Sequence, residues 1–410
     1  MKSLHWTKLP ANLVQQSVWA EIDATLLAAS LDYGRVEELF GAKPPPAKKT
    51  PPAAATAAGG GAAPANGAAG GGAAGGAAGG RRASIGTKAA APTLHVMNMK
   101  RANNISIFLA KRLGGLTVEQ LCRAAMQLDA SVLGPELLES LLENLPPETE
   151  AKALRALTAE QQASLSPPER FGWEMCRVPR LRSMLQALRL KHTLPPALRK
   201  ASAALQGVAD ATRAIMASGA LVQLLRALLA HGNFLNAGTP RGAAAGFKLD
   251  GVDKMASLRS LDGRETLLGY VAAQLPSCAE ALRSELAALP QATRVPLVEV
   301  LLLVKEVHEG VRVVGHELAL CPVADLEDDL ASDAASGGTA EPDPELMARR
   351  FRRAVGGFHQ QVQQGLDALT AQQEDTKALL RKLANFFGED PNVAKPDMII
   401  GRVADVLKKL

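Results

Sequence analysis

Aromatic residues are scarce in this chain: Phe, Trp and Tyr make up 3% of its 410 residues. Ala and Leu supply most of the 47% that is hydrophobic. These two residues favour helices, whereas aromatic and β-branched residues are enriched in strands. No stretch alternates apolar and polar residues in the way of a half-buried strand. Composition and pattern therefore predict an all-α fold, elongated rather than globular.

Cysteine is equally sparse, and its spacing excludes the usual cysteine-built sites. The four cysteines lie far apart with no CxxC pair, which gives neither zinc spacing nor a disulfide framework. We expect reduced thiols packed in helices at Cys122, Cys176, Cys278 and Cys321. His308 and His316 are separated by more than two helical turns, so they do not form an HExxH zinc site. With no P-loop or GxSxG motif either, we expect no metal, no cofactor and no enzymatic activity.

Excess charge and long apolar runs are also lacking. The formal net charge is +5, from 46 basic and 41 acidic residues that are mixed along the chain. A nucleic-acid-binding protein usually concentrates its basic residues, so no such partner is expected. The N-terminus lacks an apolar run behind a basic start, so no signal peptide is expected. The longest run of large apolar residues, 300–304, is too short to span a membrane, which favours a cytoplasmic protein.

One abrupt change of composition divides the chain. Residues 44–92 are Ala, Gly and Pro with a few basic residues, and such a stretch cannot bury enough apolar surface to offset its ordering entropy. It is predicted to be a flexible linker with a root-mean-square span of roughly 35–42 Å. Its few prolines could dock on an aromatic groove, but a stiff piece of linker is favoured. Ser84, after Arg81 and Arg82, is a possible phosphorylation site, although such short matches arise often by chance.

Helical patterns follow one another over residues 94–320, with Gly and Pro pairs such as Pro195-Pro196 as punctuation. A broad apolar face over 221–229 predicts a buried helix, which Gly232 would end as a C-cap. His231 would then be a cation at that helix end. Residues 322–345 are predicted to be a loop insertion, of which 331–345 is polar. The helix beyond it predicts a helical hairpin or coiled-coil-like bundle, through the stripe Phe351, Ala354, Phe358, Val362, Leu366 and Leu369.

Several stretches, taken in order, resemble the formin homology two domain of the formin family. They are Leu4-His5-Trp6-Thr7-Lys8-Leu9, Val18-Trp19, Glu38-Leu39-Phe40, residues 100–109 (KRANNISIFL), Val178-Pro179-Arg180-Leu181, residues 232–238 (GNFLNAG), Gly246-Phe247-Lys248-Leu249, residues 261–268 (LDGRETLL) and Phe386-Phe387-Gly388-Glu389-Asp390. Each piece is weak alone, but the ordered set over nearly the whole chain is hard to obtain by chance.

The resemblance implies a head-to-tail homodimer in which the lasso of each subunit encircles the post of the other. The implied divisions are a lasso (1–43), the linker (44–92), the knob and start of a coiled-coil region (93–195), a post region (196–275) and a coiled-coil helical region (276–410). The resemblance further implies that the dimer binds actin, nucleates unbranched filaments and stays with their barbed ends. It places the protein at the cytoskeleton.

The resemblance also assigns residues. Trp6 and Trp19 would anchor the lasso in a partner's pockets, although they could instead fold back on their own chain. The post's receiving surface would be Gly232, Asn233, Asn236 and Gly238, unless this stretch is a plain helix C-cap.

The implied actin contacts lie in two places. Ile107, which pattern alone would place in the core, matches the knob isoleucine that enters an apolar cleft of actin, with Lys111 and Arg112 beside it. Arg264 stands where the family commonly has Lys, so the charge is kept but the geometry differs.

Two further expectations concern a competing function and the two ends of the chain. A dimeric helical scaffold, or a protein that binds the sides of microtubules or actin filaments without nucleation, is the competing hypothesis. The chain starts almost at the lasso and stops where the family usually continues its last helix. Profilin–actin is therefore expected as a partner only through a short or missing proline-rich segment.

Overall fold

The computed structural model describes residues 2–22, 32–41, 96–111, 113, 115–321 and 343–410. Apart from two isolated bridges, all regular structure in these ranges is helical, which confirms the predicted all-α fold. The predicted linker (44–92) with Ser84, residue Arg112 and most of the predicted loop insertion lie outside the described residues.

The first hydrophobic core is formed by short helices that follow residue 96 together with the three long helices described next. The short helices are α4 (Met99–Lys111), α5 (Val118–Gln127), α6 (Pro135–Asn144), α7 (Glu148–Arg155), α8 (Ala159–Ala163), which buries no residue, and α9 (Pro167–Arg177). Capping boxes at Thr117, Thr158 and Ser166 start three of these helices by satisfying otherwise free backbone N–H groups. The buried Glu169 also accepts hydrogen bonds from the N–H groups of Val96 (2.7 Å) and Met97 (3.3 Å), which fixes the chain where it leads into α4.

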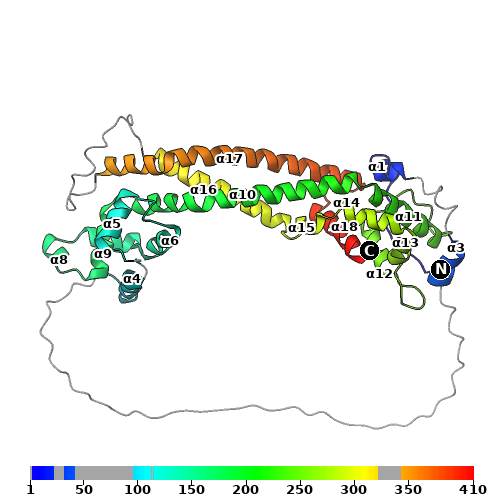
Figure 1. Cartoon of the computed structure of the whole chain (residues 1–410), viewed down its shortest axis with the longest axis horizontal. Helices are drawn as coiled ribbons and strands as arrows, with labels where there is room; N and C mark the ends of the chain where they lie inside the picture. The colour runs from blue at the N-terminus through cyan, green and yellow to red at the C-terminus, as the bar shows by residue number, and fades with distance from the viewer. Residues whose placement is uncertain (1, 23–31, 42–95, 112, 114, 322–342) are drawn as a thin grey trace, which may run out of the picture. The chain divides into compact units, whose positions relative to one another are not determined.

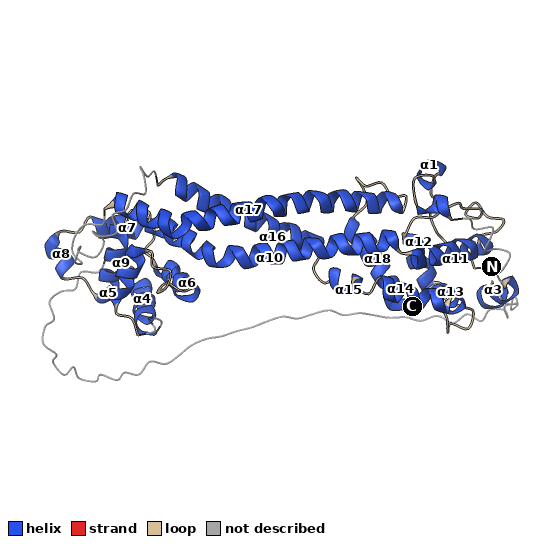
Figure 2. Cartoon of the chain, turned by 45° about the horizontal axis from the view of Figure 1, so that its top comes forward, coloured by secondary structure: helices blue, strands red, loops and turns tan. Residues whose placement is uncertain are grey.

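Three long helices continue from this core and pack side by side, as Figures 1 and 2 show. They are α10 (Leu181–Ala217), α16 (Leu297–Ala319) and α17 (Pro344–Phe386). The predicted stripe supplies the buried face of α17, where Phe351, Val362, Leu366 and Leu369 are buried. Close approach of α10 to α16 depends on Gly310, since a Cβ added there would lie 2.5 Å from Leu194 Cδ2. The helical bundle predicted from this stripe is therefore confirmed.

Pro195 and Pro196 do not end a helix, as the sequence suggested, but lie inside α10. A proline within a helix removes one hydrogen bond and crowds the preceding turn. Packing on both sides of the pair holds the helix together: Leu194 lies against α16, and Leu198 meets Gly365 of α17. The expected boundary between residues 195 and 196 consequently falls in the middle of a continuous helix.

The second core joins the end of α10 to the C-terminal helices and to the N-terminal segment, defined here as residues 2–22 and 32–41. The segment contributes α1 (Ala11–Val14), η1 (Val18–Glu21) and α3 (Tyr33–Phe40). The remaining helices are α11 (Gly219–Leu235), α12 (Asp250–Ser257), α13 (Leu267–Gln274), α14 (Pro276–Glu285), α15 (Leu289–Ala292) and α18 (Pro396–Lys409). Among the described residues no single helix is long and apolar enough to cross a membrane; α10 and α11 together, across their 56° bend, meet that test by length and composition.

Gly232 does not cap a helix, contrary to the expectation from its sequence position. Helix α11 continues through it to Leu235, and Asn236 is the C-cap. The neighbouring His231 is buried, and its Nδ1 lies 2.8 Å from the carbonyl oxygen of Ala227. Burial lowers the pKa of His231, so the ring is neutral near pH 7 rather than a cation at a helix end.

The predicted loop insertion is shorter at its C-terminal side than expected. Helix α17 already begins at Pro344, and the Asp343 carboxylate accepts a hydrogen bond from the N–H of Glu345. Proline at the first helical position and aspartate before it are favourable start signals, which explains this earlier start.

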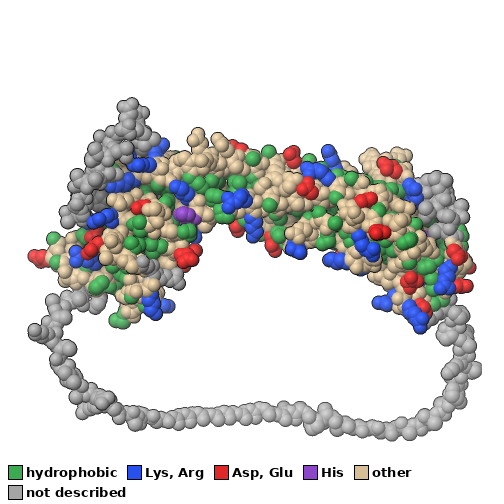
Figure 3. Space-filling model, in the orientation of Figure 1, with side chains coloured by type: hydrophobic (Ala, Val, Ile, Leu, Met, Phe, Trp, Pro, Cys, Tyr) green, Lys and Arg blue, Asp and Glu red, His purple; other side chains and the backbone are tan. Residues whose placement is uncertain are grey.

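The surface charges and three of the four cysteines agree with the sequence prediction, whereas Cys321 lies just after α16 instead of within a helix. All four cysteines are free and buried, and burial raises the pKa of Cys122 to about 12 and that of Cys176 to about 11. On the face drawn in Figure 3, basic and acidic side chains are interspersed rather than gathered on one stripe.

Candidate functional site

The N-terminal segment lies on the second core through backbone hydrogen bonds. The N–H of Leu9 donates to the carbonyl oxygen of Gly246 (3.0 Å), and the N–H of Lys248 donates to that of Thr7 (2.9 Å). These bonds align the segment antiparallel to the loop that leads into α12. They bring the indole rings of Trp6 and Trp19 to opposite parts of one apolar socket.

Trp6 fills the first part of this socket. Its ring stacks on Phe247 with centroids 4.8 Å apart, and its Nε1–H donates to the carbonyl oxygen of Arg241 (2.9 Å). The floor under the ring is Gly232, where an added Cβ would lie 2.4 Å from Trp6 Cζ3. Gly251 closes the same part of the socket from α12, with an added Cβ 3.4 Å from Trp6 Cβ. The absence of a side chain at Gly232 therefore leaves the space that the indole of Trp6 occupies.

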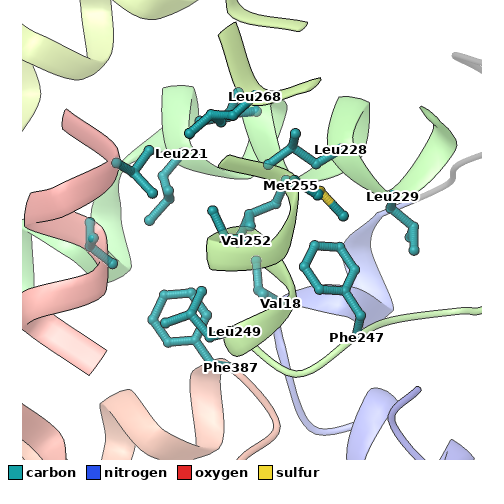
Figure 4. Packing of buried hydrophobic residues seen from close by; sticks show 14 of the residues in the cluster. Val18, Leu221, Leu228, Leu229, Phe247, Leu249, Val252, Met255, Leu268 and Phe387 are labelled. Carbon is teal, nitrogen blue, oxygen red and sulfur yellow. The ribbon is translucent and has the colours of Figure 1, made fainter. Parts of the chain in front are cut away.

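Trp19 fills the second part and is 2% exposed. Its ring lies 4.5 Å from that of Phe247, and its Nε1–H donates to the carbonyl oxygen of Phe387 (3.2 Å). A Cβ added at Gly246 would lie 2.7 Å from Trp19 Cγ. Figure 4 shows the neighbouring Val18 among the labelled residues Phe247 and Phe387. Both tryptophans thus bury their rings and satisfy their N–H groups.

Asn236 binds the backbone of the N-terminal segment from the end of α11. Its Oδ1 accepts from the N–H of Leu4 and its Nδ2 donates to the carbonyl oxygen of Leu4, each at 3.0 Å. The side chain is fully buried. Asn236 thus bonds backbone groups of the N-terminal segment of its own chain, and its place in a dimer interface stays a prediction.

Asn233 and Gly238 have other tasks. The Asn233 amide donates to the carbonyl oxygen of Ala244 (2.9 Å) and accepts from its N–H (2.7 Å), which ties the loop after α11 back onto the helix. Gly238 has φ +72 and no atom within 4 Å of an added Cβ, so it serves the turn. Of the four residues expected at the receiving surface, Gly232 and Asn236 contact the segment and these two shape its surroundings.

Sequence reasoning missed several socket residues, namely Gly246, Phe247, Gly251 and Phe387. A signal was present, because Gly246-Phe247 places a residue without a side chain beside a large aromatic ring. In this structure of one chain, the segment occupies the socket of the same chain, which is the alternative left open above.

Ile107 lies on the surface of α4 rather than in the core. Its neighbours Ile105 and Phe108 are buried, whereas Ile107 is 55% exposed. Lys111 follows one turn later and is also exposed. An isoleucine and a lysine four residues apart on one helix face form a small apolar surface with a positive edge.

Arg264 lies at the tip of a short turn. The turn is closed by the Ser260 N–H, which donates to the carbonyl oxygen of Glu265 (2.8 Å). Gly263 supplies the positive φ of +74, and the N–H of Arg264 donates to Asp262 Oδ1 (3.1 Å). The Arg264 side chain is exposed, so the turn presents a cation to solvent.

The two exposed surfaces present an apolar side chain, Ile107, and a cationic one, Arg264. No group of three or more His, Cys, Asp or Glu residues that could hold a metal ion occurs in the described ranges. Trp6, Trp19, Gly232 and Asn236 meet in one place, whereas Ile107 and Arg264 lie on separate parts of the fold.

Comparison with known proteins identifies relatives along the whole chain. Formin-like protein 20 of Arabidopsis thaliana is 26% identical over 401 residues, which cover 96% of this chain and 21% of that protein. Disheveled-associated activator of morphogenesis 1 of Homo sapiens is 25% identical over 407 residues, covering 98% and 34%. Formin-like protein 3 of Homo sapiens is 27% identical over 359 residues, covering 86% and 32%. The chain thus spans about a fifth to a third of the length of these curated relatives.

The family model described as Formin Homology 2 Domain matches residues 1–410. The match includes the N-terminal segment, its socket, α4 and the Arg264 turn, so every surface described above falls within it. The chain therefore belongs to the formin homology 2 family.

Proposed function

We propose that this chain binds actin, nucleates unbranched filaments and stays with their barbed ends as a homodimer. The observation that carries the proposal is Ile107, a large apolar side chain that is 55% exposed on α4, while its neighbours Ile105 and Phe108 on the same helix are buried. Family membership supplies the partner, since the matching residue of formins enters an apolar cleft of actin. Arg264 supplies a second, cationic contact that suits an acidic actin surface.

The packing of the N-terminal segment supports the proposed dimer. Its buried residues, including Leu4, Trp6, Trp19 and Phe40, belong to the core built by α11–α14, α17 and α18. A segment whose apolar side chains pack on another part of the fold can be exchanged for the same segment of a second copy without changing a contact. We propose that the dimer forms in this way, with each lasso seated on the other subunit's post.

Nucleation requires no covalent chemistry in this proposal. Each half of the dimer offers Ile107, with Lys111 and Arg112, and Arg264 to actin, so two halves hold actin subunits side by side. Holding them raises their effective concentration relative to one another. After nucleation, one half can release and step while the other stays bound, with residues 44–92 as the tether.

The test is a pyrene-actin polymerisation assay with wild type, Ile107→Ala and Leu302→Ala. Leu302 is a matched control because it is also 55% exposed, but on α16. We expect wild type and Leu302→Ala to shorten the lag, and Ile107→Ala to lose most of this effect.

Two outcomes would contradict the proposal. A wild-type protein that sediments as a dimer without shortening the lag would favour the scaffold hypothesis. Equal activity of Ile107→Ala and Leu302→Ala would remove Ile107 from the actin contact.

A further inference from the structure

The N-terminal segment also reaches the turn that carries Arg264. The ammonium group of Lys2 donates to the carbonyl oxygens of Arg259 (2.6 Å) and Ser260 (3.0 Å), which lie where the chain enters that turn. The N–H of Leu261 donates to the carbonyl oxygen of Leu39 (2.7 Å), at the end of α3. Two points of the segment, far apart in sequence, therefore hold three consecutive residues of the turn.

The two points are themselves joined. The N–H of Lys2 donates to the carbonyl oxygen of Phe40 (3.0 Å), so the start of the segment and the end of α3 form one clamp. Phe40 is fully buried and its ring lies 5.9 Å from that of Tyr270, on the helix that follows the turn. The clamp therefore binds the residues at the start of the turn and packs on α13, the helix that follows it.

The shape of the turn depends on Ser260, where the turn begins. The Ser260 hydroxyl donates to the Asp262 carboxylate and accepts from the N–H of Glu265 (3.1 Å). The Asp262 carboxylate in turn accepts the N–H of Arg264. A hydrogen bond to a charged group is stronger than one between neutral groups. Removing the Lys2 ammonium would therefore loosen the backbone at Arg259 and Ser260.

We propose that Lys2 is a positioning residue that couples seating of the N-terminal segment to the geometry of the Arg264 turn. A post with its lasso seated then holds Arg264 in place and binds actin more tightly than an empty post. In the dimer, Lys2 of one protomer orders the turn of the other. The coupling is reciprocal, so bound actin strengthens seating of the lasso by the same factor. The role of the turn in actin binding rests on the proposed function, whereas the ordering of the turn does not.

The first test uses hydrogen–deuterium exchange without actin, at concentrations at which sedimentation finds each variant dimeric. Peptides that cover 259–266 should exchange about five-fold faster in Lys2→Ala than in wild type, while peptides that cover α5 stay unchanged. Lys8→Ala is the matched control, since it removes an exposed lysine of the same segment. Lys2→Gln keeps a neutral donor and disturbs the dimer less than Lys2→Ala does. Its exchange rate over 259–266 should lie between those of wild type and Lys2→Ala. Equal exchange of 259–266 in wild type, Lys2→Ala and Lys2→Gln would overturn the proposal.

The second test is a double-mutant cycle on barbed-end affinity with Lys2→Ala, Arg264→Ala and the double variant. We expect Lys2→Ala to weaken binding about five-fold in the wild-type background and less than about two-fold when Arg264 is already Ala. The same loss in both backgrounds would mean that Lys2 acts independently of Arg264, which contradicts the coupling. An unchanged affinity in Arg264→Ala alone would instead remove Arg264 from the proposed actin contact, and the exchange experiment would still decide whether Lys2 orders the turn.

Discussion

The side-chain amide of Asn236 pairs with both backbone groups of Leu4, with two hydrogen bonds of 3.0 Å. The asparagine stands at the C-cap of α11, where the helix no longer needs its side chain. It therefore offers the incoming segment the donor and acceptor that a neighbouring strand would offer.

Replacing Asn236 by Ala should weaken docking of the N-terminal segment. The buried N–H of Leu4 would be left without a partner, and its carbonyl oxygen would keep only the N–H of Trp6 (3.1 Å). The expected cost is about 1–3 kcal/mol, or roughly 5–150-fold in the dissociation constant of a dimer closed by this contact. Sedimentation velocity over a dilution series measures this constant. Asn392→Ala, at an exposed position, is the control. Equal constants for both variants would show that the pairing does not support the dimer.

A methyl group at Gly232 should exclude Trp6 from its socket. The added Cβ would lie 2.4 Å from the indole, closer than any real contact of that kind, so Gly232→Ala should abolish dimerisation at micromolar concentrations. Gly207→Ala adds the same methyl group to α10, where nothing lies within 4 Å, and should stabilise the helix by about 0.5–1 kcal/mol. Light scattering distinguishes the two variants, and circular dichroism checks that both stay helical. A fully dimeric Gly232→Ala would contradict this account of the socket.

An ion pair fastens the start of α10 to the end of α16. Arg180 Nη2 lies 2.6 Å from Glu317 Oε1, and the Arg180 guanidinium also donates to the carbonyl oxygen of Leu320 (2.8 Å). Because Glu317 is buried, Arg180→Ala should lower the free energy of unfolding by about 3 kcal/mol, by leaving a buried charge without its partner.

The control for this ion pair is Arg213→Ala. Arg213 pairs with Asp210, and both side chains are more than half exposed, so the expected change is within about 0.5 kcal/mol. Urea denaturation followed by circular dichroism measures both values. If the double change Arg180→Met with Glu317→Leu does not recover the lost stability, an uncompensated Glu317 charge is not the cause.

Burial of His231 predicts a fall in stability at mildly acidic pH. Burial lowers its pKa below the usual 6.5, so the unfolded chain binds the proton more readily than the folded one. The contribution of His231 to stability is therefore complete above about pH 6.5 and is lost as the pH falls towards the folded pKa. In denaturation curves between pH 5 and 7.5, His231→Gln should show a shallower dependence on pH than wild type. His5→Gln, at an exposed position, should keep the wild-type slope.

Helices of the bundle could be predicted from the sequence because their apolar residues recur every three or four positions, which is a local signal. The stripe over α17 needs only helical periodicity and a bundle to face. Gly232 and Pro195-Pro196 were misjudged because their local signals mean helix end. Contacts with distant residues decide the outcome instead: Trp6 packs on Gly232, and Leu194 and Leu198, on either side of the prolines, pack on Gly310 and Gly365. Periodicity also favours a buried Ile107, and only the resemblance placed it outside. Lys2 and the Arg264 turn lie too far apart in sequence for any local pattern to predict the contact between them.

Phe247 touches both tryptophan rings, with centroids 4.8 Å from Trp6 and 4.5 Å from Trp19. One aromatic side chain is thus the common wall of two anchoring sites that are separated by twelve residues of chain. Pulling out either indole removes one of the two rings that hold Phe247 in place for the other. The N-terminal segment should therefore detach as one cooperative unit instead of peeling off residue by residue, which makes its release an all-or-none event.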